Sequence, residues 1–120
     1  MQPKDLNPKL RPVTEEILAN MEKGARTLTI LEEKSGLHLW LTSGLRTYYD
    51  QLRINPRNMG SAHQTGEGWD FWDPDSRLYD FLFSNEKLCE ELGLYVELKK
   101  YSGTHTHIQM RPTRARYFIP

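Results

Sequence analysis

The sequence has little cysteine, no long apolar segment and no excess of charge of either sign. Its single cysteine, Cys89, excludes an internal disulfide framework. The 16 basic residues balance the 16 acidic residues, so the charge gives no electrostatic support for a nucleic-acid partner. No apolar run reaches about 18 residues, the length that a membrane span needs, and we therefore expect no membrane insertion.

The length of 120 residues suits a single domain with one core. Residues 1–13 contain three prolines and are expected to form an extended N-terminal arm, and residues 111–120 are expected to form a C-terminal tail. The first five residues lack the apolar segment of a secretory signal peptide, so we expect synthesis in the cytoplasm. The sequence carries no signal for an oligomeric state, and a monomer is assumed.

Apolar residues at helical spacing predict helices over 14–34 and 77–92, with a short helix over 47–54. Cys89 shares the apolar face of the helix over 77–92, so we expect a buried thiol and not a nucleophile. The residues that would cap or end these helices are Thr14, Gly36, Asp75 or Ser76, and Gly93.

Alternating apolar residues predict strands over 37–42 and 68–72. The segments 94–98 and 105–110 are expected to form an antiparallel hairpin with a turn at 101–103. These elements indicate an α+β fold, with a small antiparallel sheet and helices packed on one side.

The segment 61–70 carries the most informative pattern, because it places His63 and Asp70 seven residues apart with two glycines between them. A histidine at the end of a glycine-containing bend and an aspartate on the following strand could meet at one metal ion. The third ligand would come from His105 or His107. Each histidine alone also has an ordinary explanation, as a loop residue at 63 or as surface residues of a strand at 105 and 107.

Two motifs in this order resemble those of a known family. Ser61-x-His63-x-x-Gly66-x-Gly68-x-Asp70 resembles the S-x-H-x-x-G-x-A-x-D signature of the D-Ala-D-Ala carboxypeptidase/hedgehog superfamily of zinc metallopeptidases. Within it, the run His63-Gln64-Thr65-Gly66 is similar to VanY-type carboxypeptidases and phage L-Ala-D-Glu endopeptidases. The upstream segment 43–51 is similar to that family's S-G-Y-R-S-Y-x-x-Q, and the resemblance extends from about Leu37 to Met110.

This resemblance implies a hedgehog/D-Ala-D-Ala peptidase-like fold with one zinc ion. It further implies that Arg46 binds a substrate carboxylate through its guanidinium fork. Ser61 would either hydrogen-bond the substrate or brace the loop, and His105 would stabilise the oxyanion. The zinc ligands that the resemblance implies are His63, Asp70 and His107.

The general base is where this chain departs from the carboxypeptidase pattern. That pattern has an acidic residue three positions before the last ligand, and Thr104 occupies this position here. A threonine cannot take up a proton from water. Glu97 would serve instead if it pairs opposite residue 105 or 107; alternatively, the chain binds zinc without cleaving a substrate.

The function expected from these residues is hydrolysis of peptide bonds in bacterial peptidoglycan stem peptides by a zinc peptidase of the D-Ala-D-Ala carboxypeptidase or L-Ala-D-Glu endopeptidase type. Its small size and lack of an export signal favour a phage-type lysin that reaches the cell wall after release or as a virion component. The alternatives are a non-catalytic zinc-binding structural or interaction module, and a globular domain without a metal.

Overall fold

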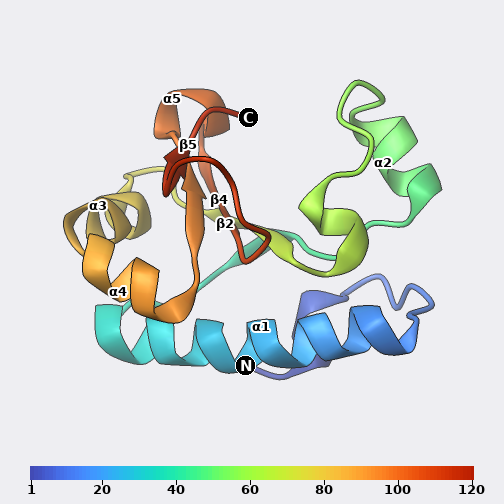
Figure 1. Ribbon diagram of the computed structural model, residues 1–120, viewed down its shortest axis with the longest axis horizontal. Coiled ribbons are helices and arrows are strands. Elements are labelled where there is room, and N and C mark those ends of the chain that lie inside the picture. Colours follow the sequence, from blue (N-terminus) through green and yellow to red (C-terminus); the bar gives the residue numbers. More distant parts are fainter.

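The computed structural model describes residues 1–120 and has an α+β architecture, as the sequence predicts (Figure 1). The helices are α1 (Glu15–Ser35), α2 (Tyr48–Ile54), α3 (Arg77–Ser84), α4 (Glu86–Leu92) and α5 (Lys99–Ser102). The strands are β1 (Leu41–Ser43), β2 (Gly68–Trp72), β3 (Tyr95–Glu97), β4 (His105–Gln109) and β5 (Tyr117–Phe118). Two short 3-10 turns are η1 (Pro3–Leu6) and η2 (Ala62–Thr65).

The five strands form one sheet in the order β1-β2-β4-β3-β5. All neighbouring strands are antiparallel except β3 and β5, which are parallel. The expectation of a purely antiparallel sheet is therefore wrong, because part of segment 111–120 forms β5. Two backbone N–H groups, from Val96 and Leu98, donate to the carbonyls of Arg116 and Phe118 and hold this strand at the sheet edge.

Helix α1 begins and ends where the sequence predicts. The side chain of Thr14 accepts a hydrogen bond from the backbone N–H of Ile17, and Gly36 ends the helix with a φ of 69°. Figure 1 shows α1 crossing one side of the sheet, with α3 and α4 near one end of α1. The apolar face of α1 is buried at Met21, Ala25, Leu28 and Leu31.

The predicted helix over 77–92 is wrong as a single element, since it breaks at Asn85 into α3 and α4. The side-chain amide of Asn85 donates to the carbonyl of Phe81 at 2.7 Å and so competes with helix continuation. The cap also differs from the expectation. Ser76 stands at the N-cap position without a capping bond, and the carboxylate of Asp73 accepts from the N–H groups of Leu78 and Tyr79.

The remaining differences lie in short segments. Of the predicted strand over 37–42 only residues 41 and 42 belong to β1, and the predicted turn at 101–103 is partly the helical turn α5. The N-terminal arm is not simply extended, because it forms η1 and places Leu6 in the core at 0% exposure. This arm is held to the chain that precedes α2 by a hydrogen bond from the N–H of Leu45 to the carbonyl of Leu6.

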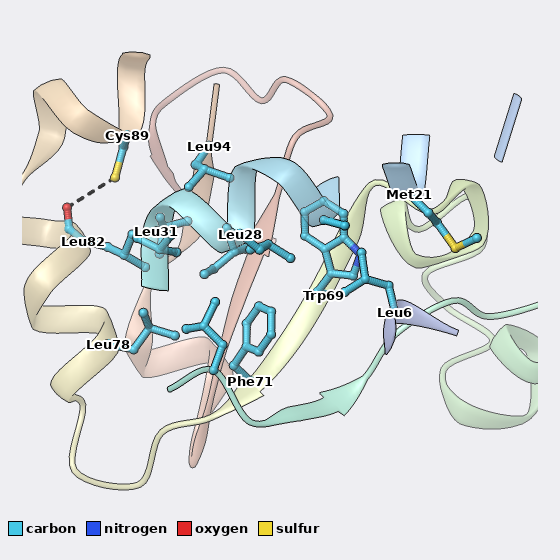
Figure 2. Packing of buried hydrophobic residues seen from close by; sticks show 14 of the residues in the cluster. Leu6, Met21, Leu28, Leu31, Trp69, Phe71, Leu78, Leu82, Cys89 and Leu94 are labelled. Carbon is cyan, nitrogen blue, oxygen red and sulfur yellow. Dashed lines mark hydrogen bonds between the residues drawn. The ribbon is translucent and has the colours of Figure 1, made fainter. Parts of the chain in front are cut away.

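The core lies between α1, α3, α4 and one face of the sheet (Figure 2). Trp69 packs against α1 at Gly24, where a Cβ would lie 2.4 Å from Cζ2 of the indole. Cys89 is buried, as expected, and its thiol donates to the carbonyl of Leu82. None of the helices combines the length and the apolar character that crossing a bilayer requires.

Candidate metal centre

The face of the sheet opposite the core carries a cluster of polar side chains from β2 and β4. Asp70 lies directly opposite His107 in the antiparallel register, so their side chains share this face. His63 reaches the same point from η2. One ligand atom of each of these three residues lies within 4.8 Å of the others, and all three residues are buried. The structure thus brings together the three predicted metal ligands, and the group could hold a metal ion.

Glycines shape the bend that carries His63, as the sequence predicts. Gly66 ends η2 with a φ of 73°. A Cβ at Gly68 would lie 2.8 Å from the Cβ of Ala62 and 3.2 Å from Cε1 of His107. The alanine that the family signature has at this position would therefore require the loop to shift.

Ser61 braces this loop, which is one of its two expected roles. Its hydroxyl accepts from the backbone N–H of His63 at 3.3 Å, and its own N–H donates to the side chain of Gln64. Gln64 also accepts from the N–H of Gly60. The side chain of Ser61 lines the cavity above the cluster as well, so contact with a bound molecule stays a prediction.

The tautomer of His63 is determined by its surroundings. Its Nδ1 lies 2.9 Å from the carbonyl oxygen of Gly44. Because a carbonyl can only accept, Nδ1 carries the proton and donates to it. This leaves Nε2, which lies 3.3 Å from Oδ2 of Asp70, as the ligating nitrogen.

Gln109 orients His107 in the same way. The side-chain Nε2 of Gln109 donates to the carbonyl of Arg111 at 2.8 Å, which turns its Oε1 toward His107. That oxygen lies 2.8 Å from Nε2 of His107, so this nitrogen carries a proton and donates. Nδ1 of His107 then faces Oδ1 of Asp70 at 2.8 Å as the nitrogen available to a cation.

The pKa shifts of the three residues indicate which of them is already in the form that ligates a metal. Burial acts to raise the pKa of Asp70, but the His107 and His63 imidazoles, which stabilise the carboxylate when they are protonated, hold this pKa far below its usual range. Burial lowers the pKa of His63 below its ordinary value, so this imidazole is neutral at neutral pH. Burial opposes protonation of His107 as well, yet a hydrogen bond from its protonated ring to Asp70 raises its pKa. An ionised carboxylate and a neutral imidazole are the forms that ligate metals, so Asp70 and His63 are in the ligating form, whereas a cation has to displace a proton from Nδ1 of His107.

Arg46 adjoins the cluster and is held from three sides. Its Nε donates to Ser43, its Nη1 to Gln51 and its Nη2 to Asp70, at 3.0, 3.1 and 3.3 Å. Gln51 is fully buried and also donates to the carbonyls of Asn55 and Asn58, so it supports the arginine. A guanidinium has five N–H bonds, so two remain for a bound molecule. Burial lowers the pKa of Arg46, although Asp70 opposes this shift.

His105 and Glu97 lie at the edge of the cluster and outside the group of three. Nε2 of His105 is 3.7 Å from Oδ1 of Asp70, and its side chain is 37% exposed. The register of β3 with β4 pairs Val96 with Ile108. Continued by one residue, this register brings Glu97 across from His107, one of the two positions that the sequence left open. The carboxylate of Glu97 accepts a hydrogen bond from the hydroxyl of Ser102. Thr104, at the position of the family's acid, is exposed.

A cavity of about 500 Å³ opens over the cluster. This volume lies within the range of small-molecule sites. Besides the three possible metal ligands, the predicted site residues that line the cavity are Arg46, Ser61, Glu97 and His105. All seven site residues expected from the sequence therefore face one space.

Sequence reasoning missed two groups that set the tautomers, the Gly44 carbonyl and Gln109. The Gly44 carbonyl has no signature, because any residue provides one. Gln109 did have a signal, since it shares the parity of His105 and His107 along β4. The chain was compared with protein-family models, with curated proteins and with solved structures, and none of the three comparisons found a match.

Proposed function

We propose that this chain is a zinc-dependent peptidase that hydrolyses peptide bonds in the stem peptides of bacterial peptidoglycan. The observation that carries the proposal is the buried His63–Asp70–His107 group beneath an open cavity. Two imidazoles and one carboxylate form a ligand set that catalytic zinc uses, and all three residues line the cavity. The motifs in segments 43–51 and 61–70 provide the link to cell-wall peptide.

The donor atoms support zinc over calcium and magnesium, because two of the three are imidazole nitrogens. Nε2 of His63 lies 3.3 Å from Oδ2 of Asp70, and Nδ1 of His107 lies 2.8 Å from Oδ1, so the three groups are close enough to share one ion. Calcium and magnesium favour sites built from oxygen atoms alone, which this group does not offer. When bound, zinc supplies a water of lowered pKa and polarises the scissile carbonyl.

Glu97 acts as the general base in this proposal. It lines the cavity across the hairpin from His107, and the hydroxyl of Ser102 orients its carboxylate. Glu97 takes one proton from the attacking water and delivers it to the nitrogen of the departing amine. The water oxygen bonds to the carbonyl carbon, the peptide C–N bond breaks, and a carboxylate and an amine leave.

Arg46 and His105 would both contact the substrate from the wall of the cavity. The two N–H bonds of Arg46 that have no partner in the protein would hold a carboxylate of the stem peptide. His105 is partly exposed and faces the cavity, so it would donate a hydrogen bond to the oxygen that gains charge. A phage-type lysin, released at lysis or carried in a virion, is the setting that we propose.

One observation favours a second function, a zinc-binding structural or interaction module. Asp70 is the only carboxylate in the group of possible ligands, and Thr104 stands where the family pattern has an acid. If Glu97 does not take the proton, the chain would bind zinc without cleaving a peptide.

Release of amino groups from purified peptidoglycan separates the two functions. We expect the zinc-loaded wild type to release them and Glu97→Gln to lose at least about a hundredfold in rate, the scale of general-base catalysis. Glu90→Gln, at an exposed position on α4, is the matched control and should keep full activity. Equal rates for Glu97→Gln and wild type would remove Glu97 from the mechanism. A wild type that binds zinc and releases nothing would support the module.

A further inference from the structure

Two exposed tryptophans lie beside the candidate metal centre and have no part in it. Trp40 directly precedes β1 and Trp72 ends β2, and their side chains are 63% and 51% exposed. The backbone N–H of Trp72 donates to the carbonyl of Trp40 at 2.7 Å, which continues the ladder from the pair Leu41 and Phe71. Residues opposite each other in such a ladder share a face, so the two indoles are neighbours on the solvent side.

This solvent side is the same face of the sheet that carries the metal centre. Trp72 and Asp70 are two residues apart on β2 and therefore point the same way. Trp72 lies opposite His105 on β4, just as Asp70 lies opposite His107. Trp40, Trp72 and His105 thus form a row beside the Asp70–His107 row, about 7 Å further along the strands. The name tryptophan row is used below for Trp40 and Trp72.

The surroundings of the tryptophan row combine flat apolar surface with polar groups. His38 contacts Trp40 edge to face, with ring centroids 4.3 Å apart, and so restrains this indole. A cavity of about 270 Å³ at this end of the sheet is lined by both indoles, by Asp75 and Arg77, and by apolar residues that include Phe71. Exposed indole faces beside charged side chains suit a ligand with an apolar face and a polar rim.

A pyranose ring has this distribution, because its axial C–H bonds form an apolar face and its hydroxyl and acetamido groups form the rim. We propose that the tryptophan row is a saccharide subsite that holds one N-acetylhexosamine ring by stacking on Trp40 and Trp72. The proposal rests on the proposed function in one respect, since the sugar would belong to the glycan that carries the stem peptide. The peptide would then occupy the Asp70–His107 row. An apolar peptide side chain is less suited, because it cannot form hydrogen bonds with the charged side chains around the indoles.

The test measures binding of a soluble β-1,4-linked tetramer of N-acetylglucosamine to the metal-free protein, with tryptophan fluorescence as the readout. Trp69 is fully buried, so a change in emission reports on Trp40 and Trp72. We expect saturable binding in the wild type. Trp40→Ala and Trp72→Ala should each weaken it about tenfold, and Trp72→Phe should retain most of it. Tyr49→Ala, which removes an exposed aromatic ring from α2, is the matched control and should bind as the wild type does.

Three results would overturn the subsite. They are absence of saturable binding, alanine variants that bind as tightly as the wild type, and a sugar-free stem peptide that binds with the same dependence on the two tryptophans. Thermal unfolding of each variant establishes that it is folded, as the exposure of both side chains leads us to expect. No metal and no bond cleavage enter this assay. A failure of the peptidase proposal would therefore leave sugar binding intact, and a failure of sugar binding would leave cleavage untouched.

Discussion

Gln109 offers a test of how the protein prepares His107 for a metal, because its amide has only one possible orientation. Its Nε2 donates to the Arg111 carbonyl at 2.8 Å, and its Oε1 accepts from Nε2 of His107 at 2.8 Å. This bond keeps the imidazole proton away from Nδ1. In Gln109→Met the acceptor is lost at nearly constant side-chain length. The proton can then move to Nδ1 and donate to Oδ1 of Asp70, 2.8 Å away.

The expected effect is a weaker affinity for zinc. Loss of a group that orients a metal-bound histidine typically reduces affinity 10- to 100-fold, which corresponds to about 1.4–2.7 kcal/mol. The affinity is measured at neutral pH by competition with a chromophoric chelator. Gln2→Met, the same exchange at an exposed position, is the matched control and should leave the affinity unchanged.

A zinc affinity of Gln109→Met within twofold of the wild-type value would refute this reasoning. The thermal midpoint of the metal-free variant separates the two possible causes of a loss. A lower affinity with an unchanged midpoint assigns the effect to the orientation of His107. A large fall in the midpoint assigns it to general loosening of β4 and contradicts the specific role.

Two further predictions concern the stability of the fold. Gly24→Ala places a Cβ 2.4 Å from Trp69 and should lower the free energy of unfolding by about 1–3 kcal/mol in denaturant titrations, whereas a gain in stability would contradict the packing. Asp73→Asn should lower it by about 2 kcal/mol at neutral pH, because the carboxylate accepts from Thr106 and from two N–H groups of α3. Burial opposes ionisation of Asp73, but these bonds lower its pKa, so its stabilisation exists above about pH 4 and is lost as the pH falls through the lower folded value. The difference between wild type and Asp73→Asn should therefore shrink in acid, and a difference that does not depend on pH would contradict this assignment.

Local patterns were sufficient for most of the elements. Thr14 and Gly36 mark the ends of α1 through side-chain and backbone chemistry that acts within one turn, so its bounds could be predicted. The alternation of β2 and β4 has a period of two, which puts Asp70 and His107 on one face once their register is known. The hairpin expected from 94–98 and 105–110 restricted only the register of β3 with β4.

Elements that depend on distant contacts could not be predicted in the same way. Strand β5 has two residues and forms because it pairs with the edge of β3. No pattern within residues 111–120 predicts this pairing. The break at Asn85 depends on whether its side chain bonds the Phe81 carbonyl or solvent. Asp73 caps α3 although it lies several residues before the helix. The sequence instead predicted a cap by Asp75 or Ser76, which lie next to the helix.

The candidate site shows the same division. The three possible ligands could be predicted from residue type and motif, and the structure brings them together. The groups that set their tautomers are a backbone carbonyl at Gly44 and the amide of Gln109. Both groups act over distances of under 3 Å, but Gly44 lies 19 residues from His63 in the chain, whereas Gln109 lies only two residues from His107 on β4. The role of Glu97 as a base stays a prediction, because its position opposite His107 permits that role without requiring it.

The most direct test of the account is the zinc content of the purified protein after equilibrium dialysis, measured by elemental analysis. We predict one zinc per wild-type chain and loss of stoichiometric binding in His63→Ala, Asp70→Ala and His107→Ala. His38→Ala removes an exposed histidine outside the cluster and should retain the full zinc content. A wild type without zinc, or a zinc content that depends on His38 and not on the three buried residues, would contradict the central claim.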